Sequence, residues 1–280
     1  MSAGASNLVL RLATAAVAVP VILSLLYLAP PWAFYALVLP ASLVATHELL
    51  AMTHPTDPVS RAIGVAVAAT SSLVVYLFPD DPRLLLTLLI SVPVVGPLVT
   101  LARLGKLETA ALRACALGLA PLFVGVPPAL LGLLLRKLGH AGPGAVLLAL
   151  GLAWFTDTGA YFTGRFFGRR KLYEAVSPKK TVEGALGGVV SSLVWAVFCS
   201  LVLLHGSLPL AHALPLAVVG GSLGQAGDLA ESLFKRSTGV KDSGAIVPGH
   251  GGVLDRIDSV LVTSVVVYLY AQWVWNTRIG

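Results

Sequence analysis

The sequence is poor in charged residues. Asp, Glu, Lys and Arg make up 11% of its 280 residues, whereas about a quarter of the residues in a soluble globular domain are charged. Hydrophobic residues account for 56%, and apolar runs repeatedly reach the roughly 20 residues that a helix needs to cross a bilayer. These features exclude an ordinary soluble protein, even one with a large core.

Cysteine is scarce as well. Cys115 and Cys199 both lie within apolar runs and have no spacing typical of a disulfide framework or metal site, so we expect small buried residues. Arg11 and the apolar stretch after it resemble a signal peptide, but no convincing small-residue cleavage site precedes Pro30. Because further apolar runs follow, an uncleaved first membrane helix is favoured.

The abundant apolar runs predict an all-α fold, a polytopic membrane bundle of about nine transmembrane helices. The expected spans are 8–29, 32–50, 62–78, 83–102, 112–135, 144–163, 184–204, 211–233 and 256–275. Prolines punctuate most of the short connections, as expected where helices stop. We find no internal repeat and no soluble domain.

Lys and Arg in the connecting loops predict the orientation of the bundle. Nine spans place the long polar loops 164–183 and 234–255 on one side, together with 15 of the 19 Lys and Arg residues. The other side holds only Arg83, Arg136, Lys137 and Arg278. The basic side is therefore expected to face the cytoplasm.

Two carboxylates stand within apolar sequence. Asp157 lies in the sixth span, where a lone carboxylate is costly and needs a cation, a metal or donors, so a functional site and a structural ion pair are both open. Helical spacing places Asp157, Ala160, Tyr161 and Gly164 on one face. Glu48 ends the second span, either at the interface or in an internal polar site.

The loop after the sixth span is basic. Membrane topology alone explains such a loop, but Ser177, Lys179, Lys180 and Thr181 form an expected turn directly before an apolar helix. A helix N-terminus beside two ammonium groups is a ready anion site, which favours phosphate binding. Glycines at 184, 187 and 188 would let this helix pack closely.

Acidic pairs flank the last polar loop. Asp228 and Glu231 are three residues apart on one helix, as are Asp255 and Asp258 on the next, so each pair shares a face. Mg²⁺ prefers such oxygen-rich sites together with substrate phosphates. Neutralisation of nearby Lys and Arg would explain the acids but not the Gly- and Pro-rich segment between them. The pattern therefore indicates metal-assisted phosphoryl chemistry.

The run SLFKRSTGVKDSGAIVPGHGGVLDRID at 232–258 resembles the signature of the phosphatidate cytidylyltransferase family. Three upstream blocks are also similar to that family: the stretch from Asp157 to Tyr161, SPKKTVEG at 177–184 and GDLAES at 227–232. The resemblance covers about 150–260. It implies that CTP and phosphatidic acid react to CDP-diacylglycerol and pyrophosphate for phospholipid biosynthesis.

The resemblance also implies residue roles. Metal ligands for Mg²⁺ would be Asp228, Asp255 and Asp258, with Asp157 or Glu231 supporting a second cation. Catalytic residues would include these three aspartates with Lys235 and His250, where His250 either donates to the leaving pyrophosphate or braces the glycine loop. Substrate-binding residues would be Ser177, Lys179, Lys180, Thr181, Ser232, Arg236, Lys241, Gly251, Gly252 and Arg256.

The implied organisation is one continuous membrane domain. Residues 1–140 would be scaffold helices, and 141–280 would carry the metal and CTP site. We expect a prokaryotic plasma-membrane protein with a cytoplasmic active site, membrane lipids as partners, no nucleic acid, and a homodimer as in the family. Alternatives are a CTP-dependent transferase acting on another lipid phosphate, a polyprenol kinase, or a transporter using Asp157 and Glu48.

Overall fold

The computed structural model describes residues 16–244 and 251–275 of the chain. Its N-terminal half contains a helix at Ala16–Tyr27, then α2 (Pro31–Thr53), α3 (Pro58–Leu77), α4 (Pro82–Ala102), α5 (Ala110–Ala120) and α6 (Pro127–Lys137). A π-helical turn at Pro121–Gly125 joins α5 to α6, so that they form one apolar segment. The all-α expectation is confirmed for this half.

The C-terminal half contains α7 (Gly142–Phe167), α8 (Val182–Phe198), α9 (Leu210–Ser237) and α10 (Leu254–Tyr270). Between α7 and α8 lies an antiparallel hairpin of β1 (Lys171–Tyr173) and β2 (Ser177–Thr181). The expected turn at 177–181 is therefore wrong: these residues form a strand that leads directly into α8. Backbone pairing with β1 holds them extended.

Each of the nine expected spans has a helical counterpart among the described residues, but only seven helical segments are long and apolar enough to cross a membrane. The described part of the first, Ala16–Tyr27, is shorter. The eighth corresponds to α9, whose glycines, Gln225 and acidic residues make it more polar. The polytopic membrane bundle is confirmed, with boundaries shifted by a few residues.

Local sequence explains where the early helices begin. Pro31, Pro58 and Pro82 each occupy the first turn of a helix, where the missing N–H costs nothing. Asp57 caps α3 by accepting from Ser60 N at 3.1 Å, and Asp81 caps α4. The prolines thus mark helix starts as well as the ends of preceding runs.

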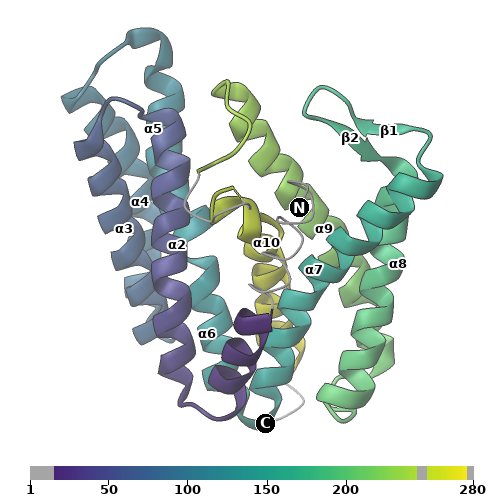
Figure 1. Cartoon of the computed structure of the whole chain (residues 1–280). Helices are drawn as coiled ribbons and strands as arrows, with labels where there is room; N and C mark the ends of the chain where they lie inside the picture. Colours follow the sequence, from purple (N-terminus) through teal and green to yellow (C-terminus); the bar gives the residue numbers. More distant parts are fainter. Residues whose placement is uncertain (1–15, 245–250, 276–280) are drawn as a thin grey trace.

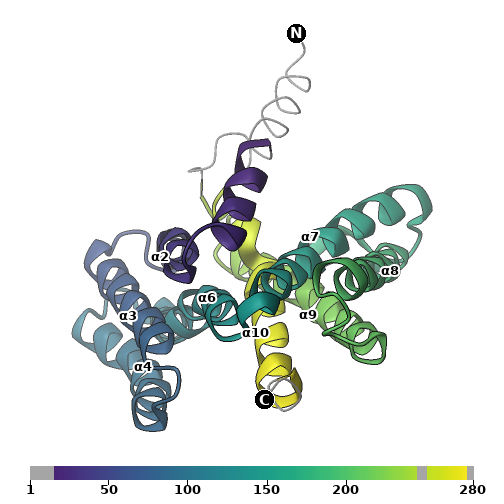
Figure 2. The same cartoon turned by 90° about the horizontal axis from the view of Figure 1, so that it is seen from below.

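Helix α10 lies between two groups of helices (Figures 1 and 2). On one side are α2 to α6, and on the other are α7, α8 and α9. Helix α10 contacts α2 and α6 as well as α7 and α9. Residues that begin α10 are consequently within reach of both halves of the chain.

Small residues bring α7 and α8 close together, as expected from the glycines in α8. A β-carbon at Gly187 would overlap the Thr163 side chain, and one at Gly188 would lie 2.9 Å from the Thr156 carbonyl oxygen. The expectation that both cysteines are buried is wrong for Cys115, which is exposed on α5. A membrane helix is apolar on its outer face too, so an apolar run does not predict burial.

Candidate active site

A cavity of about 540 Å³ opens at the end of the bundle that carries the β1–β2 hairpin. It is bordered by α7, β2, α8, α9 and α10. Five carboxylates and five cationic side chains line it: Asp157, Asp228, Asp242, Asp255, Asp258, Arg165, Lys179, Lys180, Lys235 and Arg256. The sequence motifs are thus brought together at one polar site.

Three aspartates from three helices gather on one side of the cavity. Asp157 from α7, Asp228 from α9 and Asp258 from α10 repel one another electrostatically. Asp258 is buried, and its Oδ1 accepts a hydrogen bond from Ser259 N at 2.6 Å. Ser259 Oγ also donates to Asp157 Oδ1 at 3.5 Å. This concentration of negative charge attracts a cation.

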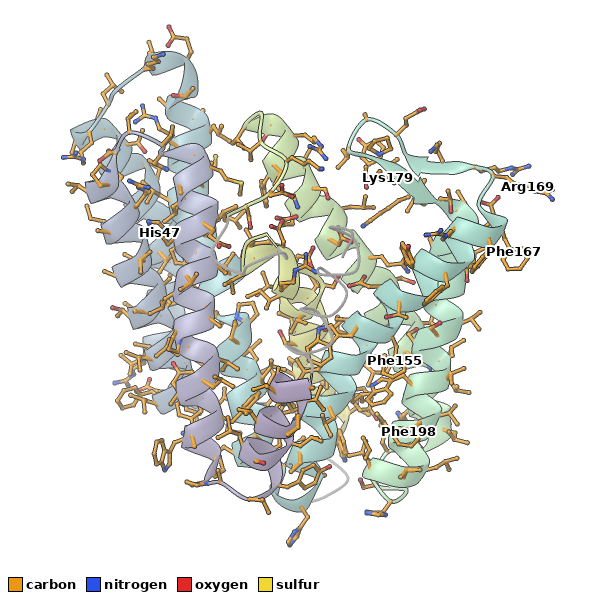
Figure 3. All side chains as sticks on the ribbon, viewed as in Figure 1. His47, Phe155, Phe167, Arg169, Lys179 and Phe198 are labelled. Carbon is orange, nitrogen blue, oxygen red and sulfur yellow. The ribbon has the colours of Figure 1, made fainter. Side chains whose placement is uncertain are left out.

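The hairpin contributes one such cation. Lys180 Nζ on β2 lies 2.6 Å from Asp228 Oδ2 on α9. Figure 3 shows Lys179 on the side of the hairpin that faces α9, whereas Arg169 and Phe167 lie at the other end. The hairpin therefore presents the ammonium groups of the SPKKT segment to the carboxylates of the helices.

Lys235 organises a second cluster. Its Nζ lies 2.5 Å from Glu231 Oε2 and 2.7 Å from Asp255 Oδ1. The other oxygen of Asp255, Oδ2, accepts from Ser243 N at 3.1 Å and Gly252 N at 2.8 Å. The predicted acidic pairs are thus divided, since Glu231 and Asp255 share Lys235 while Asp228 and Asp258 belong to the first cluster.

Two glycine features support the second cluster. Gly251 has a φ of +81°, which glycine adopts without strain. A β-carbon there would also lie 2.8 Å from Asp255 Oδ2. The glycine-rich segment therefore allows backbone to approach a carboxylate, in addition to any contact with a ligand.

Most predicted site residues line the cavity, and several do not. Ser177, Glu231, Ser232, Arg236, Lys241, Gly251 and Gly252 are outside its lining. Arg236 donates to the carbonyl oxygens of Val176 at 3.4 Å and Val240 at 3.3 Å. Thr181 is in the lining, and its hydroxyl caps α8 by accepting from Gly184 N at 3.1 Å. His250 lies outside the described residues, and all these roles stay predictions.

The cavity also includes residues to which the sequence analysis gave no role. They include Arg165, whose Nη1 donates to Tyr161 Oη at 2.9 Å, and Gln225, whose Nε2 donates to Ala185 O at 3.2 Å. Gln225 precedes Asp228 by three residues and so shares its helical face, a spacing that could have identified it. The predicted face of Asp157, Ala160, Tyr161 and Gly164 is confirmed.

The carboxylate oxygens are of the type that Mg²⁺ prefers. Within residues 16–244 and 251–275, no three His, Cys, Asp or Glu side chains lie close enough together to hold a metal. The first cluster fits a divalent cation by its chemistry, because mutually repelling carboxylates gain from a shared positive charge. In the arrangement observed, Lys180 supplies part of that charge.

Known proteins resemble part of this chain. It is 47% identical over 116 residues to a Staphylococcus saprophyticus protein named phosphatidate cytidylyltransferase, covering 41% of this chain and 44% of the relative. A Bacillus subtilis protein of the same name is 46% identical over 136 residues, 49% of each chain. The corresponding Haemophilus influenzae protein is 49% identical over 112 residues, 39% of each chain.

The matched segment thus spans less than half the length of each of these relatives. A model of the cytidylyltransferase family matches much more of the chain, from residue 9 to residue 274. That range includes every element bordering the cavity. The chain therefore belongs to the cytidylyltransferase family.

Proposed function

We propose that this protein transfers a cytidylyl group from CTP to phosphatidate, forming CDP-diacylglycerol and pyrophosphate. The observation that carries the proposal is the cavity in which carboxylates and cations from four family motifs meet. The name phosphatidate cytidylyltransferase, borne by relatives 46% to 49% identical, supports the choice of substrates. In the reaction, a phosphate oxygen of phosphatidate would form a bond to the α-phosphorus of CTP. The bond between that phosphorus and the oxygen bridging to the β-phosphate would break, and pyrophosphate would leave.

This reaction requires positioning and charge neutralisation more than covalent catalysis. The cations that line the cavity can neutralise the triphosphate and the lipid phosphate, and Lys179 and Lys180 lie on the exposed hairpin where CTP would enter from water. Tyr161 and Arg165 line the cavity near the C-terminal end of α7, where a lipid headgroup could approach from the surrounding membrane. Their linked side chains would orient the acceptor phosphate.

We propose Mg²⁺ as the cofactor. Asp157, Asp228 and Asp258 would draw together around it on binding, because they are not close enough to hold an ion in the described arrangement, and Asp255 lies in the same cavity. When bound, the ion would stabilise negative charge on the phosphates. Asp255 is already engaged by Lys235, Ser243 N and Gly252 N, which favours an orienting role for it.

We further propose that the cavity opens to the cytoplasm at a prokaryotic plasma membrane. The basic hairpin and the cationic end of α9 support this orientation, because cytoplasmic loops are rich in Lys and Arg. A homodimer and the absence of nucleic-acid partners stay predictions.

Purified protein in detergent, supplied with CTP and a panel of lipid phosphates, tests the function. We expect Mg²⁺-dependent CDP-diacylglycerol formation with phosphatidate and its loss on chelation. A preference for an isoprenoid-ether lipid phosphate would shift the acceptor class. Phosphorylation of a polyprenol, or no nucleotide-dependent product with any lipid, would refute the proposal.

A further inference from the structure

Glu48 lies far from the signature motif in sequence and touches it in space. It belongs to α2, within the half of the chain expected to be scaffold, and only 3% of its surface is exposed. Its Oε2 accepts hydrogen bonds from Ser243 Oγ at 3.2 Å and Leu254 N at 2.8 Å. Its Oε1 accepts from Val253 N at 3.1 Å.

Ser243 lies in the segment that connects α9 to α10, and the other two donors lie at the start of α10. Val253 and Leu254 begin α10, where backbone N–H groups have no partner within the helix. The side chain of Val253, the N-cap residue of α10, makes no capping hydrogen bond. The Glu48 carboxylate on α2 therefore caps α10, because it accepts the hydrogen bonds that an N-cap side chain would otherwise accept. Its negative charge is also stabilised by the positive end of the helix dipole.

Glycines make the approach possible. A β-carbon at Gly244 would overlap Glu48 Oε1, and the three nearest atoms to that β-carbon all belong to the Glu48 side chain. A β-carbon at Gly252 would meet Ser243 Oγ and Glu48 Oε2. Two glycines of the motif are thus fitted to a carboxylate on α2.

Glu48 also reaches the active-site cluster through one shared residue. Ser243 donates its hydroxyl to Glu48 and its backbone N–H to Asp255. Asp255 in turn binds Lys235. Asp258 lies one helical turn beyond Leu254, so the place where α10 begins decides where both aspartates point.

We propose that Glu48 is a positioning residue for the proposed cytidylyl transfer: by holding Ser243, Val253 and Leu254 it sets the start of α10 and thereby the placement of Asp255 and Asp258. The inference rests on the proposed function for its kinetic consequence. Its structural part, the attachment of α10 to α2, is independent of the substrate.

The kinetic test compares Glu48→Gln and Glu48→Ala with the wild-type protein. We expect kcat to fall at least tenfold while the KM for CTP changes less than threefold, because the cations of the hairpin remain in place. His47→Gln is the matched control, since His47 is the neighbouring residue on α2 and is exposed (Figure 3). It should behave like the wild-type protein.

A double-variant cycle separates direct contact from general damage to the fold. Gly244→Ala should lower kcat in the wild-type background, where its methyl group would meet the Glu48 carboxylate. In the Glu48→Ala background the carboxylate that the methyl group would meet is absent. Adding Gly244→Ala there should lower log kcat by less than half of the decrease seen in the wild-type background. Equal costs in both backgrounds would overturn direct contact.

Hydrogen exchange of the peptide covering residues 251–258 tests the attachment without any substrate. In folded, monodisperse Glu48→Gln protein we expect at least tenfold faster exchange in this peptide and unchanged exchange in α7. Unchanged exchange at 251–258 would overturn the inference even if the protein were active. A different result would separate the two proposals. If exchange is faster in the Glu48→Gln protein but the wild-type protein shows no cytidylyl transfer, the attachment of α10 to α2 is supported and the proposed function is refuted.

Discussion

Lys180 on the β1–β2 hairpin pairs with Asp228 on α9, with 2.6 Å between Nζ and Oδ2. This pair joins a strand of the hairpin to a helix of the bundle, and both of its residues line the cavity. Because Asp228 also repels Asp157 and Asp258, Lys180 offsets part of the negative charge that three aspartates concentrate there. A bound substrate and cation would compete with this ion pair.

Replacing Lys180 therefore tests substrate binding. Lys180→Met should raise the KM for CTP about tenfold or more, since a hydrogen bond to a charged group contributes roughly 1.5–3 kcal/mol. Steady-state kinetics over a CTP range measures this. Lys171→Met is the matched control, because Lys171 lies on the same hairpin outside the cavity lining and donates to the Pro178 carbonyl oxygen. Equal changes in KM for both variants would contradict a specific role.

Asp258 should be the most sensitive carboxylate. Asp258→Asn keeps the volume of the side chain but removes the charge, so activity should fall below about a tenth of wild type if the residue helps to hold a divalent cation. Formation of CDP-lipid at saturating Mg²⁺ measures the loss. Asp80→Asn, at an exposed carboxylate on the opposite end of the bundle, serves as the control. Turnover above a tenth of wild type would rule out the ligand assignment.

Lys235 should be important for stability. Its side chain is 12% exposed and is shared by Glu231 and Asp255. Lys235→Met would leave two buried carboxylates without their cation, which costs about 3–5 kcal/mol when a buried ion pair loses one partner. Thermal unfolding in detergent should show a lower midpoint. Adding Glu231→Gln should recover part of the loss, and no recovery would argue against charge as the cause.

The Asp57–Arg103 pair predicts a pH dependence outside the membrane spans. Arg103 donates from Nη2 to Asp57 Oδ1 at 2.8 Å and from Nε to both oxygens. Hydrogen bonding by Arg103 holds the pKa of Asp57 well below its usual range. The ionised carboxylate therefore stabilises the fold above its ordinary pKa of about 3.9, and this contribution is lost as the pH falls through the lower folded-state value.

Asp57→Asn separates the effect of the ion pair from that of the helix cap, because Asn removes the charge but is also a good N-cap residue. The wild-type protein should be slightly more stable near neutral pH, since water screens this exposed pair. Denaturant unfolding should show that this difference shrinks below about pH 4. Arg103→Met should reproduce the effect. A difference that stays constant down to about pH 3 would contradict the assignment.

Some features of the site were predictable because they depend on local spacing. The face of α7 that carries Asp157, Ala160, Tyr161 and Gly164 follows from helical periodicity, and all four residues line the cavity. The same rule placed Asp228 beside Glu231. Glu231 and Lys235 also follow helical spacing, four residues apart on α9, whereas the contact of Lys235 with Asp255 depends on how α9 packs against α10.

Other features were not predictable from local pattern. The strand character of the SPKKT segment arises from pairing with Lys171–Tyr173. The exposure of Cys115 depends on which face of α5 meets lipid. In the sequence Glu48 is a carboxylate near a helix end, which fits either the membrane interface or an internal polar site. Its contacts with the N–H groups of Val253 and Leu254 at the start of α10 depend on how α2 packs against α10.

The sequence by itself determined that this protein is a bundle of membrane helices with an acidic and basic site near its C-terminal motifs, because hydropathy, helical periodicity and motif composition are local properties of the chain. Only the tertiary structure decided which charges meet. Lys180 pairs with Asp228, Lys235 pairs with Asp255, and Glu48 caps α10 across about 200 residues of sequence. These contacts arise from the packing of helices distant in the chain, where burial makes each unpaired charge costly enough to select its partner.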